Sequence, residues 1–375
     1  MKIALLSGAV KNAGDFLITK RSIELLLDVL PNVHITPYIR NSVLSAGQVE
    51  EINGMDSIII AGGPYYKWDL YPQSMPLVND LSELKPKVFM MGGGWYGNTA
   101  SPSEVFHYKF SEHSRRLLNR AMNDTRILGC RDFYAVKVLK ANGINDVLMT
   151  GCPAWYDINK ICERIHFTGD VNKIAISDPA DIIHFGNQSL EVAKYLKKRF
   201  PTAEIKYLFH RGMSQDLYTD FDTAKKIECL KKQLNEIDIP YYDIAYSDTG
   251  FRMYNDCDLH VGHRVHAHIY SLSQRICSIL IEEDSRGAGA NEALGLWGIK
   301  AYKRKKELKS SIFVKAYNKV FDYTQLNEYC IAELAVYIDY LVNSKADILN
   351  LSFDRMEYYY AVMRSHIAML RDQLL

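Results

Sequence analysis

Four histidines and one arginine lie within nine residues of one another, inside the segment Asp256–His268. Zinc binding is one interpretation, but zinc ligands usually include cysteine or carboxylate at regular spacing, and the Arg264 charge would repel a dication. We favour an anion site, in which Arg264 and His266 begin a helix whose backbone N–H groups point at a phosphate or carboxylate. His260 and His268 are expected to be packed core histidines.

Two more arginines stand where a strand is expected to end and a helix to begin. Arg131 lies between Cys130 and Asp132, and Arg286 follows Asp284 by two residues. Each would present a planar cationic fork to an anion. The alternative for each is a salt bridge with the neighbouring aspartate, which at a protein surface stabilises little.

The first strand-to-helix turn reads Asn12-Ala-Gly14-Asp15. Asp15 could cap the helix, where backbone donors and the helix dipole favour a carboxylate by about 1 kcal/mol. It could equally act as a general base or bind an acceptor hydroxyl. The turn is not a dinucleotide fingerprint, because G-x-G-x-x-G is absent.

Aromatic side chains follow two glycine clusters, Gly62-Gly63 and Gly92-Gly93-Gly94. Glycine lets a backbone approach a ligand closely, and flat rings with polar edges suit a sugar. These rings could instead plug the end of the sheet. The candidate sugar contacts are Tyr65, Tyr66, Trp68, Trp95 and Tyr96.

Apolar β-type runs alternate with amphipathic helical runs, and several runs end in glycine, which predicts parallel sheets covered on both faces. In such sheets ligands bind at the carboxyl ends of the strands. A polar seam near residues 156–172 separates two series, so we predict an α/β chain with two Rossmann-like doubly wound domains, residues 1–165 and 166–310, and a C-terminal helical segment, residues 311–375. The expected strands are 3–7, 34–38, 57–61, 87–91, 126–130, 147–150, 173–177, 204–209, 242–246, 259–261 and 278–282; the expected helices are 16–30, 133–142, 189–200, 222–235 and 267–273.

The composition excludes several classes of protein. The 375 residues contain 45 Lys plus Arg against 44 Asp plus Glu, which argues against a nucleic-acid binder and against disorder. Seven scattered cysteines without a C-x-x-C pair argue against a zinc ribbon or redox dithiol and favour reduced cytosolic thiols. No apolar run is long enough for a signal peptide or a membrane span, so a cytoplasmic protein is expected, at most touching the inner face of a membrane. The 25 tyrosines are an excess that fits either a carbohydrate-like ligand or codon usage.

Taken in order, these motifs resemble the polysaccharide pyruvyltransferases. The similarity spans about residues 1–300, and Gly262-x-Arg264-x-His266-Ala267 is its most specific block. The resemblance implies a fold like that of two-domain GT-B glycosyltransferases. It also implies transfer of a pyruvyl group from phosphoenolpyruvate to two sugar hydroxyls as a cyclic ketal, with no metal or organic cofactor. Many relatives carry lysine where this chain has Arg286, and arginine does not deprotonate, so a proton-transfer role there is not expected.

Roles follow for the site residues. The donor, with its carboxylate and phosphate, would be bound by Arg131, Arg264, Arg286 and Gly262. His266 is the candidate acid because its ordinary pKa near 6.5 allows a cationic form beside phosphate, and Asp15 is the candidate base or acceptor anchor. The acceptor would be a sugar, free or in a lipid-linked oligosaccharide, bound by Asn12, Tyr65, Tyr66, Trp68, Trp95 and Tyr96.

Two alternatives to this activity stay open. One is a GT-B glycosyltransferase using a nucleotide sugar, with Glu292 as the ribose-binding acid; the other is a non-catalytic carbohydrate- or anion-binding relative. The basic run between Lys300 and Lys309 is either a solvated surface stretch or a peripheral contact with an anionic membrane leaflet. The sequence predicts neither the acceptor sugar nor the oligomeric state.

Overall fold

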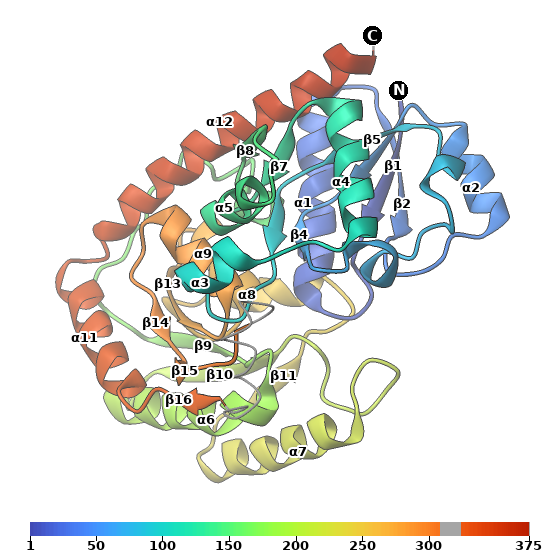
Figure 1. Cartoon of the computed structure of the whole chain (residues 1–375). Helices are drawn as coiled ribbons and strands as arrows, with labels where there is room; N and C mark the ends of the chain where they lie inside the picture. The colour runs from blue at the N-terminus through green and yellow to red at the C-terminus, as the bar shows by residue number, and fades with distance from the viewer. Residues whose placement is uncertain (308–323, 375) are drawn as a thin grey trace.

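The computed structural model describes residues 1–307 and 324–374, which form two α/β halves with a long helix running back from the second half to the first (Figure 1). β8 ends at Met149 and β9 begins at Lys173, so the seam expected from the sequence lies between the sheets of the two halves.

The N-terminal half contains two parallel four-stranded sheets. The first has the order β2-β1-β3-β5 and the second the order β4-β6-β7-β8. The strands are β1 (Lys2–Ser7), β2 (His34–Ile39), β3 (Ser57–Ile60), β4 (Gly63–Tyr66), β5 (Lys87–Met90), β6 (Gly93–Trp95), β7 (Leu128–Cys130) and β8 (Val147–Met149).

The two glycine clusters follow the ends of β3 and β5, as predicted, and the chain bends there from the first sheet into the second. β3 resumes as β4 after two residues, and β5 resumes as β6 in the same way. Gly63 has φ +106° and Gly92 has φ +60°, in the left-handed region that side chains disfavour. A Cβ atom on Gly92 would also lie 2.7 Å from Cδ of Pro153. The bend therefore requires glycine, and it places the residues that follow inside a second sheet.

The helices of this half are α1 (Ala13–Val29), α2 (Ala46–Asn53), α3 (Pro102–His107), α4 (Glu112–Thr125) and α5 (Phe133–Ala141), with short helical turns at Leu70–Ser74, Leu81–Glu83 and Pro153–Trp155. The sequence reading missed α2, α3 and α4. Side-chain caps begin these three: Ser45 accepts from the backbone N–H of Gln48, Ser101 from that of Glu104, and Ser111 from that of Ser114. Such caps satisfy donors that the first turn of a helix leaves unpaired.

The C-terminal half is built on a six-stranded parallel sheet with the order β11-β10-β9-β12-β13-β14. Its strands are β9 (Lys173–Ser177), β10 (Glu204–Phe209), β11 (Tyr241–Asp243), β12 (Leu259–Gly262), β13 (Cys277–Glu282) and β14 (Ile299–Lys300). Its helices are α6 (Ile182–Arg199), α7 (Phe221–Glu236), α8 (Val265–Ser273) and α9 (Ser285–Leu294), with a helical turn at Thr249–Tyr254. The strand order reverses between β9 and β12, and this is the topological switch point where such sheets bind ligands.

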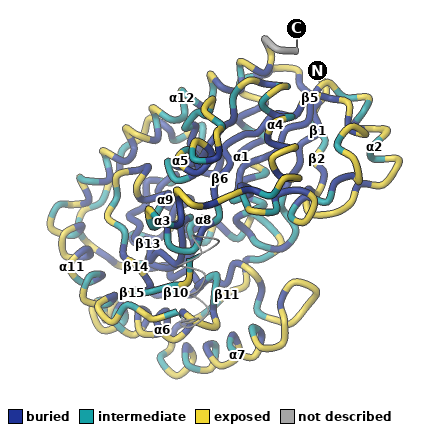
Figure 2. The backbone as a smooth tube through the Cα atoms, viewed as in Figure 1, coloured by how far each residue is buried: buried dark blue, intermediate teal, exposed yellow. Residues whose placement is uncertain are grey.

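Helix α6 begins seven residues before the predicted start at Ser189. The side chain of Asp181 accepts from the backbone N–H of His184 and caps it. Figure 2 shows buried central strands in both halves, such as β1 in the first and β13 in the second, while the outer faces of α2 and α7 are exposed.

The C-terminal segment is helical after a short antiparallel pair, β15 (Tyr302–Arg304) with β16 (Gln325–Leu326). Helix α11 (Cys330–Asn343) packs on the C-terminal half, and α12 (Ile348–Leu374) crosses to the N-terminal half (Figure 1). On α12, Tyr359 packs against Trp155 and the His366 ring lies 4.4 Å from that of Phe89. The part of the predicted helical segment between 311 and 323 lies outside the described residues, as does Lys309 of the basic run.

Candidate functional site

A cavity of about 660 Å³ lies between the two halves. The N-terminal half lines it with loops that follow β1, β2 and β4, and the C-terminal half with loops that follow β9, β10, β12 and β13. These are the carboxyl ends of parallel strands on both sides, including the switch point between β9 and β12. The cavity is therefore in the position that the strand topology assigns to a ligand.

The wall of this cavity is strongly cationic. Among the residues that the structure describes, eight lysines and arginines line it against four carboxylates. The basic residues are Lys11, Arg40, Lys67, Arg211, Arg264, Arg286, Lys305 and Lys306, and the acidic ones are Asp15, Asp181, Glu283 and Asp284. A chain whose net charge is only +1 thus gathers its positive charge where a small anion would bind.

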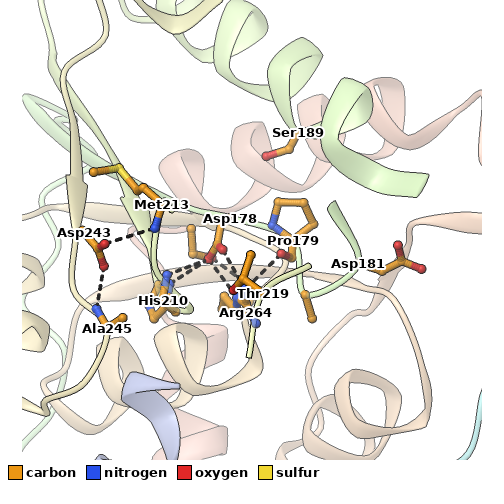
Figure 3. A network of polar contacts seen from close by, with 12 residues as sticks. Asp178, Pro179, Asp181, Ser189, His210, Met213, Thr219, Asp243, Ala245 and Arg264 are labelled. Atoms are coloured by element: carbon orange, nitrogen blue, oxygen red, sulfur yellow. Dashed lines mark hydrogen bonds and ion pairs between the residues drawn. The ribbon is translucent and has the colours of Figure 1, made fainter. Parts of the chain in front are cut away.

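Arg264 is held by a buried network at the end of β9 (Figure 3). Its Nε and Nη2 donate to the two carboxylate oxygens of Asp178 at 2.8 and 2.7 Å. Nδ1 of His210 lies 2.9 Å from the same carboxylate, and Nε2 of His210 lies 3.1 Å from the hydroxyl of Tyr254. Burial alone would raise the pKa of Asp178, but the Arg264 charge and these hydrogen bonds lower it far below its ordinary value. Arg264 is therefore fixed in one orientation at the rim of the switch point.

His266 lies in the first turn of α8 and reaches across to the other half. A Cβ atom on Gly14 would lie 1.9 Å from Nδ1 of His266, so glycine at that position makes room for the imidazole. The Nε2 atom of His266 is buried and has no hydrogen-bond partner among the described residues. Burial, and then the charges of Arg131 and Arg286, hold the pKa of His266 well below its ordinary value. Burial and the surrounding positive charge therefore both oppose protonation of the imidazole, which a bound anion would favour.

Arg286 is paired with Asp284, the alternative that the sequence left open, but the pair lines the cavity rather than the surface. The Arg286 Nε lies 2.9 Å from one Asp284 oxygen, Nη2 lies 2.5 Å from the other, and the guanidinium covers the Tyr96 ring at 5.1 Å.

The neighbouring Glu283 accepts from the backbone N–H groups of Ala180 and Asp181 at 2.7 and 3.0 Å. Burial, and then Asp284, raise the pKa of Glu283 to about 7.

On the opposite wall, Asn12 and Asp15 lie together at the start of α1. Nδ2 of Asn12 donates to Asp15 Oδ2 at 3.0 Å, and within the described residues no side-chain hydrogen bond caps the helix at Asn12. Both residues line the cavity. The carboxylate of Asp15 faces the cleft from the half opposite Arg264 and His266.

Arg131 and Gly262 do not line the cavity. Arg131 is buried, and its Nε lies 3.2 Å from Asp132, which is the structural salt bridge foreseen as the alternative. Its Nη2 has no partner among the described residues. Gly262 serves packing, because a Cβ atom there would lie 2.3 Å from Oγ of Ser177 on the neighbouring strand.

Three of the five aromatic candidates line cavities, and the other two lie in the core. Tyr65 and Tyr96 line the cavity, whereas Trp68 borders a separate hollow of about 200 Å³ that Tyr96 shares. Tyr66 and Trp95 are buried in the core: the Tyr66 hydroxyl donates to the Gly129 carbonyl, and Trp95 packs edge-on against Tyr108. The structure does not place these two where a sugar could reach them, because the chain resumes as strands β4 and β6 after the glycines.

Two further predictions agree with the structure, and several residues of the site were not predicted. His260 and His268 are buried and each lies within 2.8 Å of the Ser278 hydroxyl, as predicted for packed histidines. The sequence reading missed the cavity residues Arg40, Lys67, Arg211 and Glu283, and the Asp178 partner of Arg264. Their place in the sequence could have indicated some of them, because Arg40, Asp178 and Arg211 all come within two residues of a strand end.

Comparisons with known proteins agree with this geometry. A sequence profile of the polysaccharide pyruvyl transferase family matches residues 12–285. The chain belongs to this family. It is therefore a transferase of polysaccharide modification, and the recognition made from its motifs is confirmed. No curated protein matches the sequence.

Solved structures agree on the fold. A variant of the wall teichoic acid polymerase TagF is similar with a TM-score of 0.50 and 10% identity, covering 100% of this chain and 89% of its own. The S. aureus MnaA–UDP structure has a TM-score of 0.49 and 12% identity, covering 91% of this chain and 97% of its own. The predicted α/β fold of GT-B type with a helical C-terminal part is confirmed.

No group of three or more His, Cys, Asp or Glu side chains able to hold a metal ion occurs within residues 1–307 and 324–374. In that part of the chain, no helix has the length and apolar character needed to cross a membrane.

Proposed function

We propose that the protein transfers the pyruvyl group of phosphoenolpyruvate to two hydroxyls of one sugar in a polysaccharide or its lipid-linked precursor. One hydroxyl oxygen bonds to C2 of the donor, the methylene carbon gains a proton, the C2–O bond to phosphate breaks, and the second hydroxyl closes the ketal. The two hydroxyl protons end on the new methyl group and on phosphate. The observation that carries this proposal is the cluster of cations in the cleft of a chain from this family.

The C-terminal wall suits the donor. Phosphoenolpyruvate carries a carboxylate and a phosphate close together, so its site needs several fixed cations. Arg264 and Arg286 line this wall with orientations locked by Asp178 and Asp284, and Arg211 lines it from the end of β10. Preorganised donors of this kind stabilise developing charge without reorganising during the reaction.

His266 and Asp15 suit the proton transfers. A bound trianion would offset the arginines that hold the pKa of His266 down, so the imidazole would take up a proton as the donor binds. It could then deliver that proton to the methylene carbon. Asp15, on the other wall, could accept the proton of the attacking hydroxyl. No metal or organic cofactor takes part in this scheme, in which phosphoenolpyruvate is a co-substrate and the cytoplasm the site of action.

The nucleotide-sugar alternative depends on Glu292 as a ribose-binding acid. Glu292 lies outside the cleft, borders another hollow, and pairs with Lys137 at 2.9 Å. No other observation favours that activity over pyruvyl transfer.

Thermal unfolding with each donor separates these alternatives. A ligand at 100 times its dissociation constant stabilises the folded state by about 2.7 kcal/mol, which raises the melting temperature measurably. We expect phosphoenolpyruvate to raise it and UDP-sugars to leave it unchanged, and we expect Arg264→Gln to abolish the response. Stabilisation by a UDP-sugar alone would contradict the proposal, and a response to neither would favour a non-catalytic relative.

A further inference from the structure

Two cations of the cleft, Arg40 and Lys67, have no carboxylate partner in the part of the chain that the structure describes. In contrast to Arg264 and Arg286, neither forms an ion pair with any acid in residues 1–307 or 324–374. Asp15 is the acid that acts on both through space, without contact. Burying a cation without a counter-charge lowers the stability of the fold. Charged groups in such environments cluster at functional sites, and a bound anion would supply the missing counter-charge.

Arg40 is built rigidly into the wall. It follows β2, is only 7% exposed, and donates from Nη1 to the carbonyls of Ala61 and Gly62 at 2.8 and 2.9 Å. Gly8 and Gly63 make room for it, because Cβ atoms at these positions would lie 2.7 and 2.9 Å from its Nη2. Burial lowers the pKa of this guanidinium. The surrounding backbone thus holds a desolvated positive charge at the edge of the cavity.

Lys67 extends the same wall. Its backbone N–H donates to the carbonyl of Tyr65, whose ring lies 5.6 Å from the guanidinium carbon of Arg40. Its ammonium lies over the Tyr96 ring at 5.3 Å. Burial, and then Arg40 and Arg286, lower the pKa of Lys67. Lys67 therefore lies between the cations of the N-terminal wall and those proposed to hold the donor.

Arg40 and Lys67 line the cavity from the N-terminal half, together with Asn12, Asp15 and Tyr65, whereas Arg264 and Arg286 line it from the C-terminal half. Because the donor is proposed to bind the arginines of the C-terminal half, the positive charges of Arg40 and Lys67 are available to the other substrate. We propose that Arg40 and Lys67 bind an anionic group, phosphate or carboxylate, carried by the acceptor saccharide, so that the protein selects acidic over neutral acceptors. This inference rests on the proposed function for the identity of the second substrate.

Equilibrium binding in the presence of saturating phosphoenolpyruvate tests the inference. The probes are glucose 1-phosphate, glucuronic acid and neutral glucose, and the proteins are wild type, Arg40→Gln, Lys67→Gln and Arg116→Gln. Arg116 is an exposed arginine on α4 and serves as the matched control. Within residues 1–307 and 324–374 the Lys67 side chain forms no hydrogen bond, so Lys67→Gln remains informative if loss of Arg40 disturbs folding.

We expect at least one acidic probe to bind the loaded wild type about tenfold more tightly than glucose, as one charged hydrogen bond supplies. Both cleft variants should lose that preference while binding phosphoenolpyruvate within threefold of wild type, and Arg116→Gln should keep it. Preference for the phosphate or the carboxylate probe identifies the source of the charge.

Equal binding of acidic and neutral probes, or no binding of an acidic probe, would overturn the inference. Weakened phosphoenolpyruvate binding with unchanged probe binding in Arg40→Gln would also overturn the inference, because Arg40 would then bind the donor. If wild type binds acidic probes through Arg40 but never binds phosphoenolpyruvate, the anion site stands and the proposed function fails.

Discussion

Replacing Asp178 by asparagine would leave the Arg264 guanidinium buried without its counter-charge. The Asp178 carboxylate is 5% exposed and accepts two bonds from Arg264, with two more from the backbone and ring of His210. Breaking a buried pair by removing one partner costs about 3–5 kcal/mol, because the other charge stays in a medium that solvates it poorly. We therefore expect Asp178→Asn to lower the free energy of unfolding by that amount.

Asp256→Asn is the matched control. Asp256 also pairs with two cations, Lys173 and Lys206, at 3.3 and 2.7 Å, but its side chain is 55% exposed. Exposed pairs contribute about 0–1 kcal/mol, so this variant should stay near wild type. Comparing the two variants thus shows whether burial of the carboxylate or the number of its ionic contacts determines the loss in free energy of unfolding.

Urea unfolding at pH 6 and pH 8 measures both variants, together with Arg264→Gln and the double variant Asp178→Asn/Arg264→Gln. The folded-state pKa of Asp178 lies below its unfolded value, so its contribution is fully present above pH 4 and is lost only as pH falls through the folded value. The deficit should therefore be equal at both pH values, and the double variant should lose less than the two single variants together. A deficit for Asp178→Asn no larger than for Asp256→Asn, or strict additivity in the double variant, would refute this reasoning.

Three more substitutions test the cleft. Gly14→Ala would force a Cβ atom to 1.9 Å from the His266 ring, at a cost of about 1–3 kcal/mol and at least a tenfold fall in kcat. Gly47→Ala should stay near wild type in both assays, because no described atom outside its own helix backbone lies within 4 Å of the new Cβ. His266→Gln should reduce phosphate release at saturating phosphoenolpyruvate by about 10²–10⁴-fold while donor binding persists; near-wild-type turnover would exclude His266 as the acid. The pKa of Glu283 is about 7 in the fold against an ordinary 4.5, so the folded state binds its proton more tightly and the free energy of unfolding falls as pH rises between these values, by about 3 kcal/mol. Glu283→Gln should remove that slope in urea unfolding, and an unchanged slope would contradict the assignment.

Much of the fold and part of the site could be predicted from the sequence. Alternating β-type and helical runs predicted the parallel sheets, because fully buried strands are continuously apolar. Arg264 and His266 were found because they follow β12 at a helix start. Asp284 and Arg286 were found in the same way after β13. In each case the signal lay within a few consecutive residues.

The rest depended on contacts between distant segments. Asp178 lies 86 residues before Arg264, and nothing in either segment names its partner. Arg40 belongs to no motif, and the space for its side chain depends on glycines in two other segments, Gly8 after β1 and Gly63 at the start of β4. The pKa of Glu283 depends on burial that the fold creates around the end of β13. Tyr66 and Trp95 were misplaced because strands as short as β4 and β6 leave little periodicity to detect.

A single reaction containing phosphoenolpyruvate, a pool of cell-envelope saccharides and the protein tests pyruvyl transfer itself. Released phosphate and glycan-bound pyruvyl groups are quantified together, the first by colorimetry and the second by mass spectrometry. We predict equal amounts of the two products with wild type and neither product with His266→Gln. Release of UDP from an added UDP-sugar, with no phosphate released from phosphoenolpyruvate, would contradict pyruvyl transfer.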